Sequence, residues 1–214
     1  DVSDTRKKDF WEFDPSAGVL GTWTRKADLS GEERYAAQGF SIRNKGYVGT
    51  GYNFSFLNDV WEYNQVNDTW SEKASLPGGI RNTATAFSIG NKGYMGLGGN
   101  ATVGLNDFWE YSPEVECNSW TQFPDFPGAK RAAPVAFSIA DKGYISTGSG
   151  PLGLMNDTWE FDPLTKYWTQ KADFPGIARH AAVGFVINNK AYVGSGINMY
   201  TAYSDFYEYD PLLN

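Results

Sequence analysis

Short apolar runs of about five residues alternate with polar turn residues along the whole chain. Four segments share one form of this pattern, in which two apolar runs are split by Asn or Asp, Lys, and Gly or Ala: GFSIRNKGYVGTG, AFSIGNKGYMGLGG, AFSIADKGYISTG and GFVINNKAYVGSG. Runs of this length between turn residues predict strands. The Gly after the two polar residues is expected to supply the positive φ of a tight turn. Each segment is therefore predicted to be a β-hairpin of two strands, a and b.

A second pattern recurs between these hairpins. Its core is aromatic-Glu-aromatic and begins at Trp11, Trp61, Trp109, Trp159 and Tyr207, with gaps of 50, 48, 50 and 48 residues. A second tryptophan follows each of the first four cores, at Trp23, Trp70, Trp120 and Trp168. These two positions contain all eight tryptophans of the chain and predict two further strands, c and d. Four antiparallel strands in roughly 50 residues, with small residues in b and bulky ones in c and d, form a wedge like a propeller blade.

The repeat resembles that of Kelch-type β-propellers over residues 9–214. The period, the glycines that end strand b, the later Tyr/Trp pair and the Arg after the d–a turn all match. The versions with NDxWEY and FPG..R are most similar to Kelch repeats of secreted bacterial proteins. The family's adjacent glycine pair after strand b is replaced by Thr50-Gly51, Thr147-Gly148 and Ser195-Gly196, and Gly98-Gly99 lies one residue late. The resemblance implies an all-β fold of four-stranded antiparallel blades.

The predicted strands divide the chain into three complete blades flanked by two partial ones. Residues 1–34 hold strands c and d, and residues 180–214 hold strands a, b and c. The complete blades are predicted at 35–81, 82–131 and 132–179. Kelch propellers usually have six or seven blades. The resemblance therefore implies a segment of a larger propeller, with the remaining blades on the same longer chain.

Charge and apolar content exclude two classes of partner. The 214-residue chain has a formal net charge of −7 and a pI near 4.7, whereas nucleic-acid binding requires a basic face. No apolar run approaches the ~18 residues of a transmembrane helix, so no direct membrane insertion is expected. The resemblance implies a secreted or cell-surface location. A cytoplasmic location stays open, because the single cysteine, Cys117 in the turn EVECN, permits no internal disulfide.

The sequence contains no residue pattern typical of catalysis. Copper oxidases of the galactose-oxidase type share the Kelch fold and need more than one histidine, but His180 is alone, and with Cys117 it forms no zinc site. Carboxylates such as Asp59 and Glu62 recur in every blade, so they are predicted to fix each blade, the Asp by bonding local backbone. A glycosidase instead needs two carboxylates in one cleft. We therefore expect no enzyme activity, no catalytic residue, no metal and no cofactor.

One arginine precedes strand a in each repeat: Arg34, Arg81, Arg131 and Arg179. These arginines could bond a neighbouring blade or a carbonyl at the rim of the central channel. They could instead ring the mouth of the channel and bind a partner. In Kelch substrate adaptors the matching arginines bind acidic partners, and paired Arg–carboxylate bonds suit that task. The sequence leaves both interpretations open.

The b–c loops vary most between the repeats, at 52–57, 100–105, 150–155 and 197–203. In a blade the b–c and d–a connections emerge on one face, so these loops are expected to surround the arginines. The lysines of the a–b turns are expected to lie solvated on the opposite face. Variable loops with aromatic and Met side chains are typical of binding sites. The predicted partner-binding residues are the four arginines and Tyr52, Phe54, Phe56, Leu152, Met199 and Tyr200.

These observations predict a non-catalytic recognition or scaffold module for a protein or peptide partner that presents a carboxylate or another polar anion. Exchange of Arg81 and Arg131 for Glu is then expected to weaken binding and leave the fold intact. One alternative is a secreted propeller that binds or processes carbohydrate, with a glycan in place of the polypeptide. Another is a structural element of a cell-surface assembly.

Overall fold

The computed structural model describes residues 6–100, 104–114 and 119–213. Cys117 and part of the b–c loop at 100–105 lie outside the described residues. The regular elements in the described part are strands and one short 3₁₀ helix, Pro211–Leu213.

Most strands belong to antiparallel sheets that follow one another along the chain. The first sheet pairs β1 (Phe10–Asp14) with β2 (Thr22–Lys26). The second contains β3 (Gln38–Ile42), β4 (Lys45–Asn53), β5 (Ser55–Asn64) and β6 (Thr69–Lys73). The third contains β7 (Thr85–Ile89), β8 (Lys92–Gly96), β9 (Phe108–Ser112) and β10 (Ser119–Phe123).

The fourth sheet contains β11 (Val135–Ile139), β12 (Lys142–Ser146), β15 (Thr158–Asp162) and β16 (Tyr167–Lys171). A small ribbon, β13 (Ser149–Gly150) with β14 (Gly153–Leu154), lies in its b–c loop. The fifth sheet contains β17 (Val183–Ile187), β18 (Lys190–Gly194) and β19 (Phe206–Tyr209).

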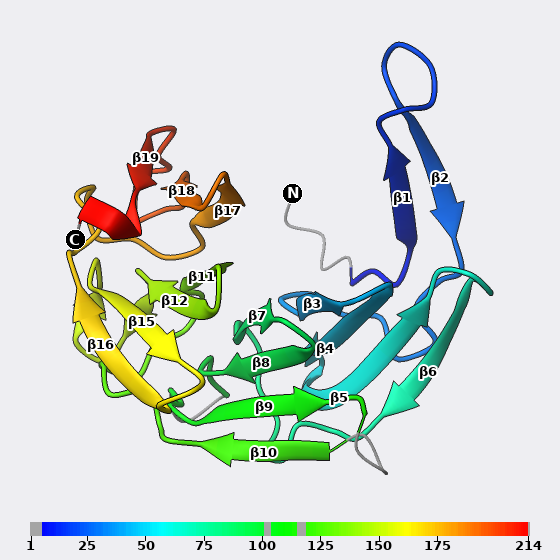
Figure 1. Ribbon diagram of the computed structural model, residues 1–214. Helices are drawn as coiled ribbons and strands as arrows, with labels where there is room; N and C mark the ends of the chain where they lie inside the picture. Colours follow the sequence, from blue (N-terminus) through cyan, green and yellow to red (C-terminus); the bar gives the residue numbers. More distant parts are fainter. Residues whose placement is uncertain (1–5, 101–103, 115–118, 214) are drawn as a thin grey trace.

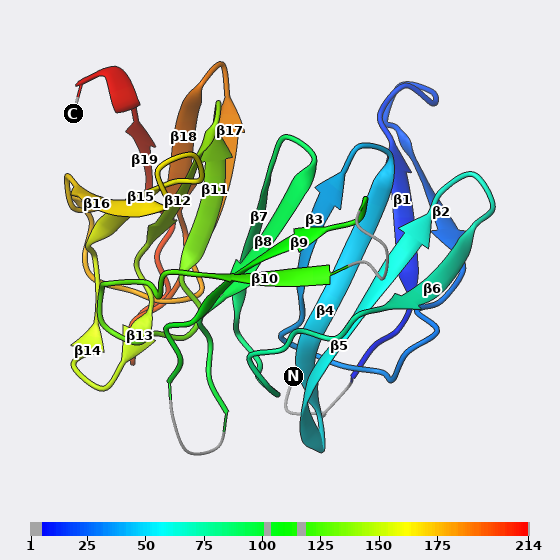
Figure 2. The same cartoon turned by 60° about the horizontal axis from the view of Figure 1, so that its bottom comes forward.

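The sheets are arranged as the blades of a propeller, with β3, β7, β11 and β17 nearest the centre (Figure 1). Their strand sets agree with the predicted c–d pair, three complete blades and a–b–c set. Among the described residues no strand pairing joins the first sheet to the fifth. The a–b hairpins point to one face, and the β4–β5 tip and the β13–β14 ribbon point to the other (Figure 2). These two b–c loops therefore lie on the face opposite the a–b turns, as predicted.

Neighbouring blades pack through aromatic seams. A Cβ on Gly93 would lie 2.1 Å from Cε2 of Phe40 in the preceding blade, and one on Gly143 would lie 2.2 Å from the ring of Phe87. Neither glycine has a positive φ; the positive φ values of these hairpins belong to the turn residues before the lysine, such as Arg43. The predicted turn role of the glycine after the polar pair is therefore wrong. This glycine instead makes room for the ring of the preceding blade.

The repeated glutamate of strand c bonds strand b. The Tyr47 hydroxyl donates to Glu62 at 2.8 Å, and Nζ of Lys45 lies 3.3 Å from the same carboxylate. The same Tyr–Glu bond recurs in the next three sheets, as Tyr94–Glu110, Tyr144–Glu160 and Tyr192–Glu208. The turn lysines, expected to be solvated, are held in ion pairs: Lys45–Glu62, Lys92–Glu110, Lys142–Asp162 and Lys190–Glu208. The glutamate therefore fixes each blade, as the sequence predicts.

Candidate functional site

The arginine before strand a is buried against the aspartate that lies two residues before the aromatic core of strand c. In the third sheet the Arg81 guanidinium donates to both carboxylate oxygens of Asp107, at 2.6 and 2.7 Å, and to the Leu97 carbonyl at 3.0 Å. The Arg81 side chain is 0% exposed, and the Asp107 side chain is 17% exposed. The same fork joins Arg34 to Asp59, Arg131 to Asp157 and Arg179 to Asp205.

Each fork closes one blade, because the arginine lies before strand a and its acceptors lie at the two ends of the b–c loop. The aspartate also accepts from the tryptophan two residues later, as in the 2.7 Å bond from Trp109 Nε1 to Asp107. The same bond occurs at Trp11, Trp61 and Trp159. The predicted structural role of the aspartate therefore holds, but its side-chain donors are Arg and Trp rather than local backbone.

The expectation that the arginines form a rim open to a partner is wrong. Their exposed fractions are at most 5%, and their donors bond internal carboxylates and carbonyls. The other interpretation holds only in part: a carbonyl bond is present, but it joins the arginine to the end of strand b in the same blade, and the aspartate that accepts most of its bonds was not predicted. Exchange of Arg81 or Arg131 for Glu would place two carboxylates together inside a blade. Such a protein is expected to lose its fold rather than to keep it intact.

The pairing keeps the aspartates ionised. Burial opposes the ionisation of Asp59 and Asp157, but hydrogen bonds from the arginine and the tryptophan outweigh it and hold the pKa of both carboxyls below the usual value. At Asp205 the hydrogen bond from Arg179 is the main cause of the lowered pKa. Such carboxyls carry no proton near neutral pH and are unsuited to general acid catalysis.

Backbone bonds link the blades around the central axis. The N–H of Thr83 donates to the Ala36 carbonyl at 3.1 Å, that of Ala133 to Thr83 at 2.9 Å, and that of Ala181 to Ala133 at 2.9 Å. All four residues have a positive φ, which is unfavourable for side chains with a Cβ and persists where the surrounding structure fixes it. A cavity of about 430 Å³ lies at this level, lined by Ala, Thr, Val, Gly, Gln and Pro residues. This is the central channel of the propeller.

Strands b and c of the second sheet extend past the blade into an aromatic hairpin. Tyr52 pairs with Phe56 across it, and their rings meet edge to face at 5.1 Å. The ring of Tyr35 lies 5.4 Å from that of Tyr52, and the two residues form an antiparallel bridge. Phe54 at the tip is 76% exposed, with the guanidinium carbon of Arg6 3.3 Å from its ring centre. The hairpin thus presents an apolar surface on a framework of packed rings.

A hollow of about 410 Å³ lies at the base of this hairpin. Its described lining carries no charged side chain. The side chains beyond Gly and Ala are Phe56, Asn82, Thr83, Asn100, Ser149 and Pro151. Amide and hydroxyl groups from two blades therefore lie beside an aromatic wall, the ring of Phe56, from a third blade.

The structure brings together only part of the predicted set. Phe56 lines the hollow, with Tyr52 packed against it. Leu152 is 85% exposed and follows Pro151 of the lining. Met199 and Tyr200 lie on the b–c loop of the fifth sheet, 77% and 90% exposed, and do not line the hollow.

Sequence reasoning missed the polar lining. Asn82 directly follows the buried Arg81 and bridges to Gly99, and the equivalent Ala132 bridges to Ser149. The residues at this position are Tyr35, Asn82, Ala132 and His180. This position varies between the repeats although the arginine before it does not, and that difference is the sequence signal for the lining of the hollow.

The described residues offer neither a metal site nor a membrane-spanning helix. No group of three or more His, Cys, Asp or Glu side chains is placed to hold a metal ion there. No helix in that part of the chain is long and apolar enough to cross a membrane.

Comparison with known proteins supports the architecture. No family model matches the sequence, and no curated protein matches it either. The fold is similar to the solved structure of YjhT, with a TM-score of 0.78 and 16% sequence identity over 90% of this chain and 68% of that chain. The chain is a β-propeller with Kelch-like repeats. At this identity the likeness concerns the fold alone.

Proposed function

We propose that the chain is a non-catalytic recognition module that binds a polypeptide through its loop face. The loop face is defined as the β4–β5 hairpin, the hollow at its base and the β13–β14 ribbon. The observation that carries the proposal is an exposed aromatic hairpin beside an uncharged hollow. Aromatic side chains that stand next to a pocket contribute most of the free energy in many interfaces.

The rigidity of the loop ends supports this proposal. In the third sheet, for example, the fork holds Leu97, the residue after strand b, and Asp107, the residue before strand c, so the b–c loop starts and ends at fixed points. A loop fixed in this way loses little conformational entropy when a partner binds. The scaffold repeats while the loops differ, which is the usual division between framework and recognition surface.

The internal pairing of the arginines changes the expected chemistry of the partner. An acidic group is not required, because no free guanidinium of the four lies on this face. The amides and hydroxyls of Asn82, Thr83 and Ser149 suit uncharged polar groups, such as the backbone amides of a peptide. Phe54 and Phe56 suit its apolar side chains.

A second candidate function is carbohydrate binding, and the same lining favours it. Asn amides and Ser or Thr hydroxyls beside an aromatic ring suit the hydroxyls and the apolar face of a sugar. Carbohydrate processing is not supported by this hollow, because its described lining has no carboxylate. In either case the likeness of the repeats to those of secreted bacterial proteins favours a role outside the cell or at its surface.

A peptide display library and a glycan array, both probed with the 214-residue chain, distinguish the two functions. We expect the chain to select specific peptides from the library. Selection of a specific glycan instead would show that the ligand is a carbohydrate. The variant F54S/F56S is expected to lose about tenfold or more in affinity. The control L164S/Y167S changes two exposed residues, one on outer strand β16 and one in the turn before it, and is expected to bind normally. Equal loss in both variants, or no ligand from either screen, contradicts the proposal.

A further inference from the structure

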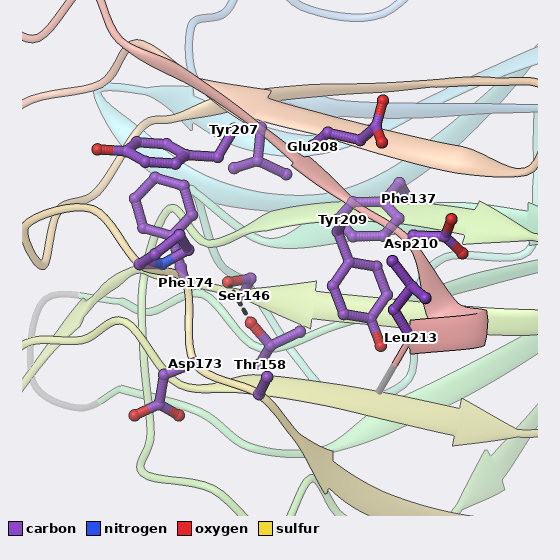
Figure 3. Close-up of a pocket in the computed structure, with 13 residues that line it drawn as sticks. Phe137, Ser146, Thr158, Asp173, Phe174, Tyr207, Glu208, Tyr209, Asp210 and Leu213 are labelled. Atoms are coloured by element: carbon purple, nitrogen blue, oxygen red, sulfur yellow. Dashed lines mark hydrogen bonds between the residues drawn. The ribbon is translucent and has the colours of Figure 1, made fainter.

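Hollows in this propeller differ in what surrounds them. Figure 3 shows the cavity between the fourth and fifth sheets, where Thr158 and Tyr209 lie at the wall and the hydroxyls of Ser146 and Thr158 share a 2.8 Å hydrogen bond. In the second sheet the equivalent place holds the tryptophan of strand d, Trp70, whose ring lies 5.0 Å from that of Tyr63. That cavity therefore belongs to the repeated framework of the blades. The hollow on the loop face lies among b–c loops that differ from blade to blade.

Lys130 stands at the edge of the loop-face hollow. A Cβ on Gly104 would lie 3.4 Å from the Cβ of Lys130, and one on Gly150 would lie 2.0 Å from the Lys130 carbonyl oxygen. Both glycines line the hollow. Because neither has a side chain, the loops of the third and fourth sheets approach Lys130 closely. The residue itself is exposed, so its ammonium group is accessible beside the hollow.

The charge of Lys130 has no internal complement in the part of the chain that the structure describes. Lysines on strands b and d lie in ion pairs with strand-c carboxylates, as in Lys92–Glu110 at 3.4 Å and Lys171–Glu160 at 3.5 Å. No ion pair of this kind joins Lys130 to a described carboxylate. Lys130 therefore differs from these framework lysines, and its ammonium group is available to a ligand.

The hollow itself supplies no carboxylate to Lys130. Its described lining carries no charged side chain, and the arginines of this face are bonded inside the blades. An exposed ammonium group next to an uncharged hollow is complementary to an anion on the bound partner. A carboxylate is the side-chain anion that a polypeptide offers, and it accepts charge-assisted hydrogen bonds from lysine.

The position of Lys130 varies between the repeats. Directly before the repeated arginine, the chain has Glu33, Ile80, Lys130 and Ala178. These side chains are acidic, aliphatic, basic and small, whereas the arginine that follows is the same in every repeat. A framework role would require one residue type here. The variation instead fits a position that sets the preference of each part of the face for a ligand.

We propose that Lys130 is a specificity-determining residue of the loop face, and that it selects a polypeptide with an Asp or Glu next to the residue that enters the hollow. This inference rests on the proposed function and adds a carboxylate to the description of the partner. The four internally paired arginines have no part in it. An apolar side chain meets Phe56, and the neighbouring carboxylate meets Lys130.

A random peptide display library tests the inference when it is selected in parallel on the parent chain, on Lys130→Glu and on Lys166→Glu. Lys166→Glu is the matched control, because it makes the same change of charge at an exposed residue of a c–d turn. The parent and the control are expected to enrich Asp or Glu at one fixed distance from an apolar residue. Lys130→Glu is expected to enrich Lys or Arg at that place. Absence of the acidic enrichment, or the same enrichment on Lys130→Glu, overturns the inference.

Affinities locate the contact. The most enriched parent peptide is resynthesised with its acidic residue changed to the amide, and both peptides are titrated against the parent chain and Lys130→Met. Each single change is expected to weaken binding about three- to fivefold, as for an exposed ion pair. Both changes together should weaken it no more than either alone, and multiplication of the two losses overturns the contact.

The outcomes separate this inference from the proposed function. Peptides that depend on Phe54 and Phe56 but not on Lys130 leave the proposed function standing and overturn the inference. A library that yields no peptide overturns both. Selection of acidic glycans in place of peptides also overturns the inference, because the carboxylate would then belong to a carbohydrate.

Discussion

Removal of one aspartate from an Arg–Asp fork is expected to destabilise the whole propeller. Asp107→Ala leaves the Arg81 guanidinium, which is 0% exposed, with carbonyl acceptors and no anion. It also leaves the Trp109 indole without its 2.7 Å acceptor. Breaking a buried ion pair by removing one partner costs about 3–5 kcal/mol. Because the Asp107 side chain is 17% exposed, we expect the lower part of that range, about 3 kcal/mol.

Urea unfolding followed by tryptophan fluorescence and far-UV circular dichroism measures this loss. The matched control is Asp28→Ala, which breaks the Arg25–Asp28 pair at 2.9 Å, whose side chains are 58% and 39% exposed. That exposed pair is expected to contribute about 0.2–1 kcal/mol. Similar losses in Asp107→Ala and Asp28→Ala would refute the structural role of the forks.

A double variant separates the cost of the unpaired Arg81 guanidinium from the other effects of Asp107→Ala on the unfolding free energy. Arg81→Met in the background of Asp107→Ala removes the uncompensated guanidinium. The two losses are then expected to be non-additive by about 1–3 kcal/mol, as for residues in one hydrogen-bonded network. Simple additivity would show that the two side chains do not act as a pair.

Three further predictions concern the fork carboxyls, a tryptophan between two blades and a pair of glycines. Three fork carboxyls have a lowered pKa in the folded state. The unfolding free energy should therefore be constant above about pH 4 and fall as the pH drops through their folded pKa values. A decrease of the unfolding free energy already at pH 6 would contradict this prediction. These carboxyls are Asp59, Asp157 and Asp205. Trp159 packs against Phe126 between two blades, so Trp159→Ala should cost about 3 kcal/mol of unfolding free energy and clearly lower the melting temperature. Trp23 is 65% exposed, so Trp23→Ala should change the melting temperature little. Equal melting temperatures of the two variants would contradict this prediction. Gly98→Ala should destabilise the protein more than Gly79→Ala. Both glycines have a positive φ, but only a Cβ at position 98 would lie 2.5 Å from a carbonyl oxygen. Equal unfolding free energies of the two variants would show that this close contact does not determine the loss.

The fold was predictable because each structural requirement recurs in every blade. Strand number, strand order and the face of each loop follow from the period of the aromatic cores and hairpins. The partners that each side chain binds were harder to predict from the sequence. Position alone places Arg81 on the loop face but does not tell whether its guanidinium points outward or into the blade. The nearly constant spacing of 25 or 26 residues to an aspartate in each repeat, as from Arg81 to Asp107, was the available signal for an internal pair.

Two features required three-dimensional contacts. Gly93 looks like a turn residue in the sequence, but its role depends on Phe40, which comes from another blade. The hollow depends on the paths of the b–c loops, which differ between repeats and therefore carry no periodic signal. Asn82 and Ser149 are far apart in the sequence and meet only because successive blades rotate about one axis.

Hydrogen–deuterium exchange with and without a ligand selected by the screens tests recognition through the loop face most directly. Slower exchange is predicted in the β4–β5 hairpin at 51–57, at 99–100 and in the β13–β14 ribbon at 149–154, because these backbone segments surround the hollow. Slower exchange confined to the a–b turns of the opposite face, or to the outer strands β6, β10 and β16, would contradict it.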